Sequence, residues 1–330
     1  MKDGLLIYGI IRADSLLESE KMDIGSPAAP AVFTVRFKDL AAVVSTHPLV
    51  AYDTLPKEQV MKGLAVHQLV IEKVMERFTV VPVKFGTMVE SKDEIVKFLE
   101  KGYALLSDML EKRKGQIELD IVAWWELPEI LPILSRQNSQ IQEKQQEIAQ
   151  KGDRASEEDK ILLGQYIQQA LSTEKVGYQQ LISQMLQQEA EDVCMHNQLD
   201  DQIIFNAAFL LEKQNEASFH RAIDTLDQDL QGRLHFRVVG PLPTYSFSTI
   251  QVKRIDPESV EAAKKTLALP AEFTDKDVQD AYHKLAREYH PDTSSGEDTQ
   301  EFQRVHSAHT TLRDFMEHGS IYPEVYQYTQ

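Results

Sequence analysis

The sequence predicts an α+β protein with a separate all-α unit near its C-terminus. Two observations predict the α+β part: short apolar segments that alternate with a period of two residues, and amphipathic helices placed between them. A third observation, two amphipathic helices on either side of a Ser/Gly-rich connection, predicts the small helical unit. We therefore expect two α/β sandwich domains, joined by a helical hairpin and followed by a helical module.

Residues 1–126 are expected to form an N-terminal α/β domain of the ferredoxin-like type. The hairpin at residues 31–46 shows the pattern most clearly, because Phe33, Val35 and Phe37 alternate onto one face before a short turn. The expected strands span residues 5–12, 31–37, 40–44, 80–84 and 116–125, and the two expected helices span residues 57–78 and 91–114.

The first of these helices carries a histidine on its apolar face. Its stripe consists of Val60, Leu64, His67, Ile71, Val74 and Phe78. A histidine in such a stripe is more often a core residue than a catalytic one, so we interpret His67 as core. In the second helix Ser91 and Glu94 have capping-box spacing, and Gly115 is expected to end it.

Residues 127–200 are expected to form a middle segment that folds as a helical hairpin. Its first part is rich in glutamine, and the apolar spacing favours packed helices over a low-complexity segment. Ser156 and Asp159 have the spacing of an N-terminal cap for a long helix.

The α/β pattern returns over residues 201–252, which we expect to form half of a second ferredoxin-like unit. Pro241 and Pro243 forbid a regular helix and predict an extended path at its end. Residues 249–259 are interpreted as a linker, and residues 319–330 as a tail whose docking the sequence leaves open.

Composition limits the classes of partner and compartment. The chain has 330 residues, 42% of them hydrophobic, and a formal net charge of −17. This charge argues against nucleic acid as a partner. No apolar run approaches the ~18 residues of a membrane span, no signal peptide is evident, and Cys194 is the one cysteine. We expect a cytoplasmic protein without a disulfide.

The sequence offers no recognisable catalytic, cofactor or metal site. His283, His290, His306 and His309 lie close in the sequence, but helical spacing explains them, so we expect no metal site. No glycine loop has the phosphate-binding pattern, and no Ser-His-Asp or paired-carboxylate site can be named from spacing. We therefore expect no cofactor and no catalytic residue, with an enzyme on this fold as the least favoured alternative.

The helical unit at residues 258–318 contains the tripeptide His290-Pro291-Asp292. Thr274 caps the helix before it, and the proline is expected to stop that helix. The apolar stripe of the first helix consists of Val278, Ala281, Tyr282, Leu285, Ala286 and Tyr289, and that of the second of Phe302, Val305, Ala308, Leu312 and Phe315. Helices with such stripes pack antiparallel and hold the tripeptide at an exposed tip.

These residues resemble a J domain, the DnaJ-type module that stimulates the ATPase of a DnaK-type chaperone. The matching segments are LALP, AYHKLAREYHPD and FQRVHSAHTTL. The resemblance implies that His290, Pro291 and Asp292 engage the chaperone and that Lys284 and Arg287 supply a basic docking face. Thr293 stands where the family usually has lysine. Residues 258–318 contain 7 Lys/Arg and 13 Asp/Glu, a net charge of 7 − 13 = −6, so the basic face is thin.

Residues 4–250 resemble the GvpF/GvpL family of gas vesicle accessory proteins. The resemblance rests on LLIYGII, DLAAVVS, the segment HQLVIEKVMERFTVVPVKFGTMV and the segment RLHFRVVGPLPTYSF. It implies two ferredoxin-like domains joined through helices, contact with the small hydrophobic (GvpA-type) shell protein, and a role in vesicle assembly. The family supplies no catalytic residue.

The two resemblances together imply a non-enzymatic assembly factor that associates with gas vesicles. Its α/β part would bind the shell protein and prevent its aggregation, and its J-like unit would bring a DnaK-type chaperone to that client. The alternative is a general DnaJ-type co-chaperone whose α/β part selects a different client.

Overall fold

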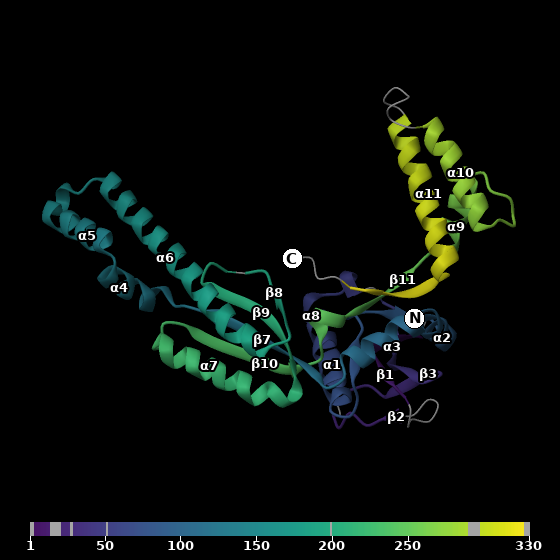
Figure 1. Cartoon of the computed structure of the whole chain (residues 1–330), viewed down its shortest axis with the longest axis horizontal. Coiled ribbons are helices and arrows are strands. Elements are labelled where there is room, and N and C mark those ends of the chain that lie inside the picture. The colour runs from purple at the N-terminus through teal and green to yellow at the C-terminus, as the bar shows by residue number, and fades with distance from the viewer. Residues whose placement is uncertain are drawn as a thin grey trace. The chain divides into compact units, whose positions relative to one another are not determined.

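The computed structural model describes residues 3–13, 21–26, 29–50, 52–198, 200–289 and 298–326. The chain divides into two compact units, one made of residues 1–112 and 248–327, and the other built on residues 113–247. Both units combine helices with an antiparallel sheet, which confirms the α+β class (Figure 1). Among the described residues, no helix is both long and apolar enough to cross a membrane.

The first unit contains a six-stranded antiparallel sheet in the order β2-β3-β4-β1-β5, with β6 also pairing with β1. The predicted hairpin is confirmed, because Phe37 lies opposite Leu40 and Lys38 has a φ of 54° in the turn between them. The strands are β1 (Asp3–Arg12), β2 (Lys21–Met22), β3 (Val32–Phe37), β4 (Leu40–Pro48), β5 (Val80–Pro82) and β6 (Met88–Val89).

Three helices and a 3-10 turn complete this domain: η1 (Tyr52–Thr54), α1 (Lys57–Met75), α2 (Lys92–Lys101) and α3 (Tyr103–Lys112). Ser91 caps α2 as predicted by accepting the Glu94 backbone N–H at 3.3 Å. The single helix expected from Ser91 is divided at Gly102, where any Cβ would overlap the ring of Pro323. Glycine is needed here because another segment approaches the helix backbone.

The expectation of a linker is wrong, because part of it pairs as a strand with part of the predicted tail, whose docking the sequence leaves open. β11 (Ile250–Arg254) and β12 (Ile321–Val325) form an antiparallel pair. Ile250 and Ile321 are buried in the same core as α2 and α3. Each strand is only five residues long and its partner lies some seventy positions away, so local periodicity did not reveal the pair.

The second unit contains a four-stranded antiparallel sheet in the order β10-β7-β9-β8. Its strands are β7 (Gln116–Trp124), β8 (Asp192–Met195), β9 (Ile203–Glu212) and β10 (His235–Leu242), with 3-10 turns η3 (Gln187–Glu189) and η4 (Lys213–Asn215) beside them. Helix α7 (Glu216–Leu230) covers one face, where the Phe219 ring packs 5.1 Å from that of Phe209.

Strand β7 corrects the predicted domain boundary. The sequence predicts residues 116–125 as a strand of the first domain, but Leu119 lies opposite Phe209 and Ile121 opposite Ala207 in the second sheet. A period of two residues identifies a strand but not its partner, which is chosen by the matched apolar faces of distant segments. The extended path expected at Pro241 and Pro243 is confirmed, because β10 continues to Leu242, and the short helix α8 (Tyr245–Ser248) begins only after these prolines.

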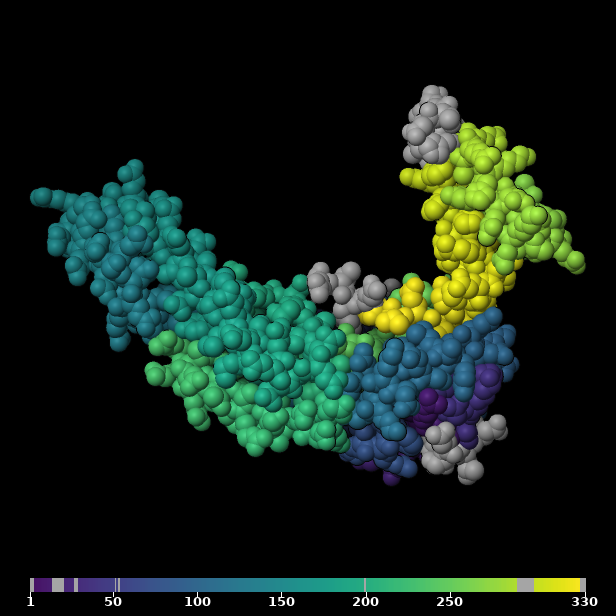
Figure 2. All heavy atoms as spheres, viewed as in Figure 1, coloured from purple at the N-terminus to yellow at the C-terminus, as the bar shows by residue number. Residues whose placement is uncertain are grey.

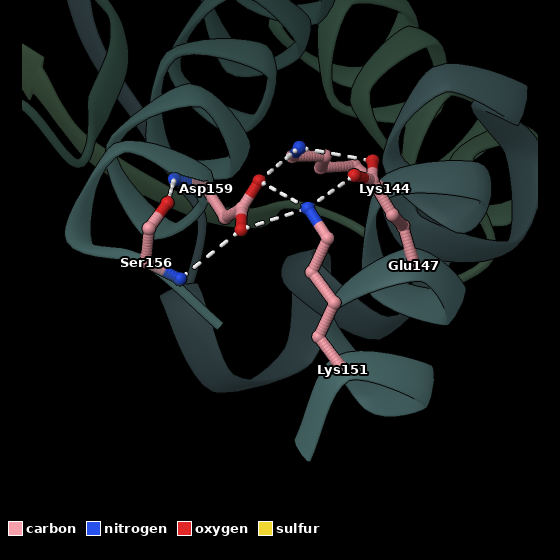
Figure 3. Close-up of polar contacts among 5 residues, drawn as sticks. All are labelled: Lys144, Glu147, Lys151, Ser156 and Asp159. Carbon is pink, nitrogen blue, oxygen red and sulfur yellow. Dashed lines mark hydrogen bonds and ion pairs between the residues drawn. The ribbon is translucent and has the colours of Figure 1, made fainter. Parts of the chain in front are cut away.

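The middle of the chain forms three helices, α4 (Leu127–Gln137), α5 (Ser139–Lys151) and α6 (Glu157–Leu186), with the 3-10 turn η2 (Gly152–Arg154) between the last two. The predicted cap is confirmed as a complete capping box between Ser156 and Asp159. Asp159 also accepts hydrogen bonds from Lys144 at 2.7 Å and from Lys151 at 3.0 Å (Figure 3). Glu147 pairs with both lysines, so this cluster joins the end of α5 to the start of α6.

The C-terminal helical unit consists of α9 (Pro257–Thr266), α10 (Asp275–Glu288) and α11 (Asp298–His318). It appears in Figure 2 as yellow-green and yellow spheres. Its own core contains Val260, Ala263, Leu267, Val278, Val305, Ala308 and Leu312. The two predicted apolar stripes therefore face each other, and Thr274 caps α10 with a full capping box.

Candidate functional site

The C-terminal helical unit presents a charged face on α10. Its apolar side packs against α11, where the Tyr282 ring stacks 4.1 Å from that of His309 and the Tyr282 hydroxyl lies 3.2 Å from His306 Nδ1. Lys284 and Arg287 lie on the opposite side of α10 and are both exposed. Neither forms an ion pair within the described part of the chain.

The tripeptide His290-Pro291-Asp292 lies outside the described residues. The structure does describe the helix end that precedes it, where the Tyr289 N–H donates to the Leu285 carbonyl at 2.9 Å. It also shows an acidic residue, Asp280, exposed one helical turn before Lys284. The basic face is therefore small, as the charge count of the sequence indicates.

The structure gathers three of the four histidines that the sequence analysis set aside. The rings of His283, His306 and His309 all lie within about 6 Å of the Tyr282 ring. Burial lowers the pKa of His309, and the positive charges of Arg313, His306 and His283 lower it further. No group of three or more His, Cys, Asp or Glu suited to a metal ion is found among the described residues.

A second polar cluster lies in the unit built on residues 113–247, and the sequence did not predict it. Glu118 of β7 accepts hydrogen bonds from the backbone N–H and the hydroxyl of Ser246, at 2.8 Å and 2.9 Å. His196 Nε2 lies 3.2 Å from the same hydroxyl. Burial raises the pKa of Glu118, and the neighbouring charge of Asp120 raises it further.

This cluster connects α8 to the sheet. Glu118 and Ser246 are 128 positions apart, so no local pattern could have joined them. The two hydrogen bonds from Ser246 are made to a carboxylate inside the protein, since Glu118 is 1% exposed. We therefore interpret the cluster as a structural anchor for α8.

His67 is a core residue, as predicted. Its side chain is 1% exposed, and its ring packs 5.2 Å from that of Tyr8 and 5.4 Å from that of Phe85. Burial lowers its pKa to about 4, against a smaller opposing effect of the Val83 backbone. The imidazole is therefore neutral near pH 7.

Comparison with known proteins agrees with this architecture. The model of the family "Gas vesicle synthesis protein GvpL/GvpF" matches residues 4–249, and the DnaJ domain model matches residues 265–318. Gas vesicle protein F from a Nostoc species is 26% identical over 192 residues, which are 57% of this chain and 78% of that protein. Gas vesicle protein F from Haloferax mediterranei is 23% identical over 256 residues, 76% of this chain and 96% of that protein.

Two crystal structures of GvpF have a similar fold. The protein from an Anabaena species gives a TM-score of 0.62 at 24% identity, covering 75% of this chain and 98% of that one. The protein from Microcystis aeruginosa gives a TM-score of 0.55 at 23% identity, covering 74% of this chain and 98% of that one. The first family model spans well over half of the chain. The chain therefore belongs to the GvpL/GvpF family of gas vesicle synthesis proteins and carries a DnaJ domain in addition.

Proposed function

We propose that this protein is a non-enzymatic, cytoplasmic assembly factor of gas vesicles that connects the shell protein to a DnaK-type chaperone. The α/β part binds the apolar shell protein and keeps it from aggregating, and the DnaJ domain recruits the chaperone. The kinship with gas vesicle protein F and the DnaJ match support this combination. An apolar subunit needs its surface covered until it joins the growing shell.

The observation that carries this proposal is the way in which the DnaJ domain is attached. It is inserted between β11 and β12, and both strands pack on the core of the first domain. Only Ile255 and Asp256 connect β11 to α9, and only Gly319 and Ser320 connect α11 to β12. The Ile255 N–H donates to the Ser320 carbonyl at 3.1 Å, so the two connections are themselves joined.

Two short tethers have a functional consequence. A module on one long linker would sample many positions, whereas this one stays close to the first domain. A chaperone bound to the DnaJ domain is thereby kept near a client held by the α/β part. In this proposal His290, Pro291 and Asp292 contact the chaperone, and Lys284 and Arg287 attract an acidic surface on it.

The test needs a variant that loses the DnaJ domain and keeps β12. A truncation near Lys253 removes β12 with the helices, and so damages the first domain. Because Arg254 lies opposite Ile321, residues 255–320 can be replaced by a two-residue Asn-Gly turn. We expect this excision variant to bind the co-expressed shell protein as the wild type does, and to lose stimulation of the chaperone ATPase.

Point variants of the full chain separate the two activities. The His290→Gln variant is expected to lose ATPase stimulation while retaining the shell protein, and Lys284→Glu with Arg287→Glu is expected to weaken stimulation. The matched control is His283→Gln, which changes an exposed histidine of α10. Failure of the wild-type chain to retain shell protein, together with normal vesicles after gene deletion, would favour a general co-chaperone with another client.

A further inference from the structure

The first domain contains an apolar groove of about 670 Å³ beside the first half of α1. This volume lies within the range of ~300–1,000 Å³ that is usual for ligand sites. The groove is lined mostly by apolar and aromatic side chains, among them Leu6, Tyr8, Pro48, Val50, Tyr52 and Val66. All of these residues belong to one unit of the chain.

The groove exists because α1 packs closely on the sheet over only its second half. His67, Val70, Ile71 and Val74 are buried, whereas residues 57–66 are exposed or half-buried. The Tyr52 ring fills part of the space beside the first half. It lies so near Gly63 that a Cβ there would come within 3.0 Å of it. The glycine therefore lets an aromatic wall stand against the helix backbone.

This wall is preformed by a continuous row of rings. Tyr8 packs on His67, His67 on Phe85, Phe85 on Tyr52, and Tyr52 on His47, with ring centroids 4.6–5.8 Å apart. His47 Nδ1 lies 2.9 Å from the Pro48 carbonyl, which only accepts, so this nitrogen carries the proton. The Tyr52 hydroxyl lies 3.3 Å from Nε2 of His47. The side chains that shape the groove are thus held before any partner arrives.

The charge of the lining defines the partner that fits. No acidic residue is found in the described part of the lining, although the chain as a whole carries 52 Asp and Glu. Lys62 is the one charged residue of the described lining, and it stands at the rim with its side chain 78% exposed. Its pair with Glu58, at 3.5 Å between two exposed side chains, is weak. The groove therefore suits an apolar segment that carries an acidic group beside its apolar residues.

We propose that this groove is where the protein holds the shell protein, and that it takes an apolar segment of that protein with an acidic side chain placed at Lys62. This inference rests on the proposed function. Apolar side chains of the client cover Pro48, Val50 and Val66, and the ring of Tyr52 contacts them edge-on or face-on. Leu6 and Tyr8, which also line the groove, are themselves buried. Occupation of the groove excludes other shell subunits from the same apolar residues, which keeps the client from aggregating.

The test compares variants of the full chain that fill the groove or change its charge. Val66→Trp places a large side chain in the groove, and Leu64→Trp is the matched control on an exposed position of α1 outside the lining. We expect Val66→Trp to reduce the retained shell protein about ten-fold and Leu64→Trp to change it less than about two-fold. Lys62→Glu is expected to weaken retention in low salt, and Lys57→Glu, on the same helix outside the lining, is expected not to.

A photo-crosslinking measurement keeps the proposal testable if Val66→Trp unfolds. Benzoylphenylalanine in place of Gln59, which lines the groove, is expected to crosslink to the shell protein. The same residue in place of Met61, which is exposed and lies outside the lining, is expected not to crosslink. Equal crosslinking at both positions, or crosslinking of Gln59 to a second copy of this chain, would overturn the assignment. If every variant retains shell protein like the wild type, the groove is the wrong site and the proposed function stands. If the wild type retains none, the proposed function itself fails.

Discussion

Arg254 lies directly opposite Ile321 in the β11–β12 ladder, although 66 residues and three helices separate them in the chain. Arg254 also donates to both carboxylate oxygens of Glu94, at 3.2 Å and 2.9 Å, while Ile321 is buried in the first core. The chain therefore leaves the first domain, forms the DnaJ helices and returns to the same place. The DnaJ domain is an insertion in that domain.

The first prediction concerns the returning strand. Ile321→Ala leaves a cavity in the first core, although the residue lies beyond the DnaJ helices, so we expect it to lower the free energy of unfolding by about 2–4 kcal/mol. Urea unfolding followed by circular dichroism measures this loss. Val325→Ala, at a position that is 40% exposed on the same strand, should change the free energy by less than about 0.5 kcal/mol. An equal effect of the two substitutions would show that β12 does not contribute to the core.

The second prediction uses two glycines next to or inside helices. Gly102→Ala should destabilise the protein by about 1–3 kcal/mol, because the new methyl group overlaps Pro323 and pushes β12 away. Gly164→Ala in α6 meets no atom within 4 Å, so the better helix propensity of alanine should stabilise by up to about 1 kcal/mol. Thermal unfolding of both variants decides the matter, and a stabilising Gly102→Ala would contradict the close approach of β12.

The third prediction concerns acid stability. The pKa of His67 is about 4 in the folded chain and near 6.5 when unfolded. The unfolded state therefore binds a proton first as the pH falls, so stability is lost between about pH 6.5 and pH 4. The total loss is about 3 kcal/mol. Urea midpoints measured across this range should show the slope, and His67→Phe should flatten it. A slope that survives this substitution would assign the effect to other groups.

The fourth prediction concerns the cluster at the end of α5. The hydrogen bonds that Lys144 and Lys151 donate to Asp159 hold the pKa of this carboxyl group well below its usual range. A depressed carboxyl pKa stabilises the fold above the ordinary aspartate pKa of ~3.9, and this contribution is lost only as the pH falls through the lower folded value. Asp159→Ala removes the capping box and leaves Lys144 buried without its main partner, so the α5–α6 end should open more often.

Hydrogen exchange of residues 144–165 measures that opening. The exchange should become clearly faster in Asp159→Ala and stay unchanged in Lys160→Gln, which removes only the exposed pair with Glu157. Unchanged protection in both variants would mean that packing alone holds the two helices together.

Local chemistry accounts for most elements that could be predicted from the sequence. Ser156 with Asp159, and Thr274 with Asp277, cap their helices because the interacting groups lie within one turn of each other. The alternation at residues 31–37 predicts a strand for the same reason. In the candidate site, Lys284 and Arg287 lie on the exposed face of α10, opposite the apolar stripe, and their role in binding a partner stays a prediction.

The α+β class, the caps and the position of the DnaJ helices could be predicted from the sequence, since each depends on neighbours within a few residues. The three-dimensional fold was needed to show that β7 joins the second sheet, that β12 pairs with β11, and that the first half of α1 borders a groove. Those features depend on which distant apolar faces match and on how closely two backbones can approach, as Gly102 and Pro323 do. Periodicity along one segment carries no information about the surface of its partner.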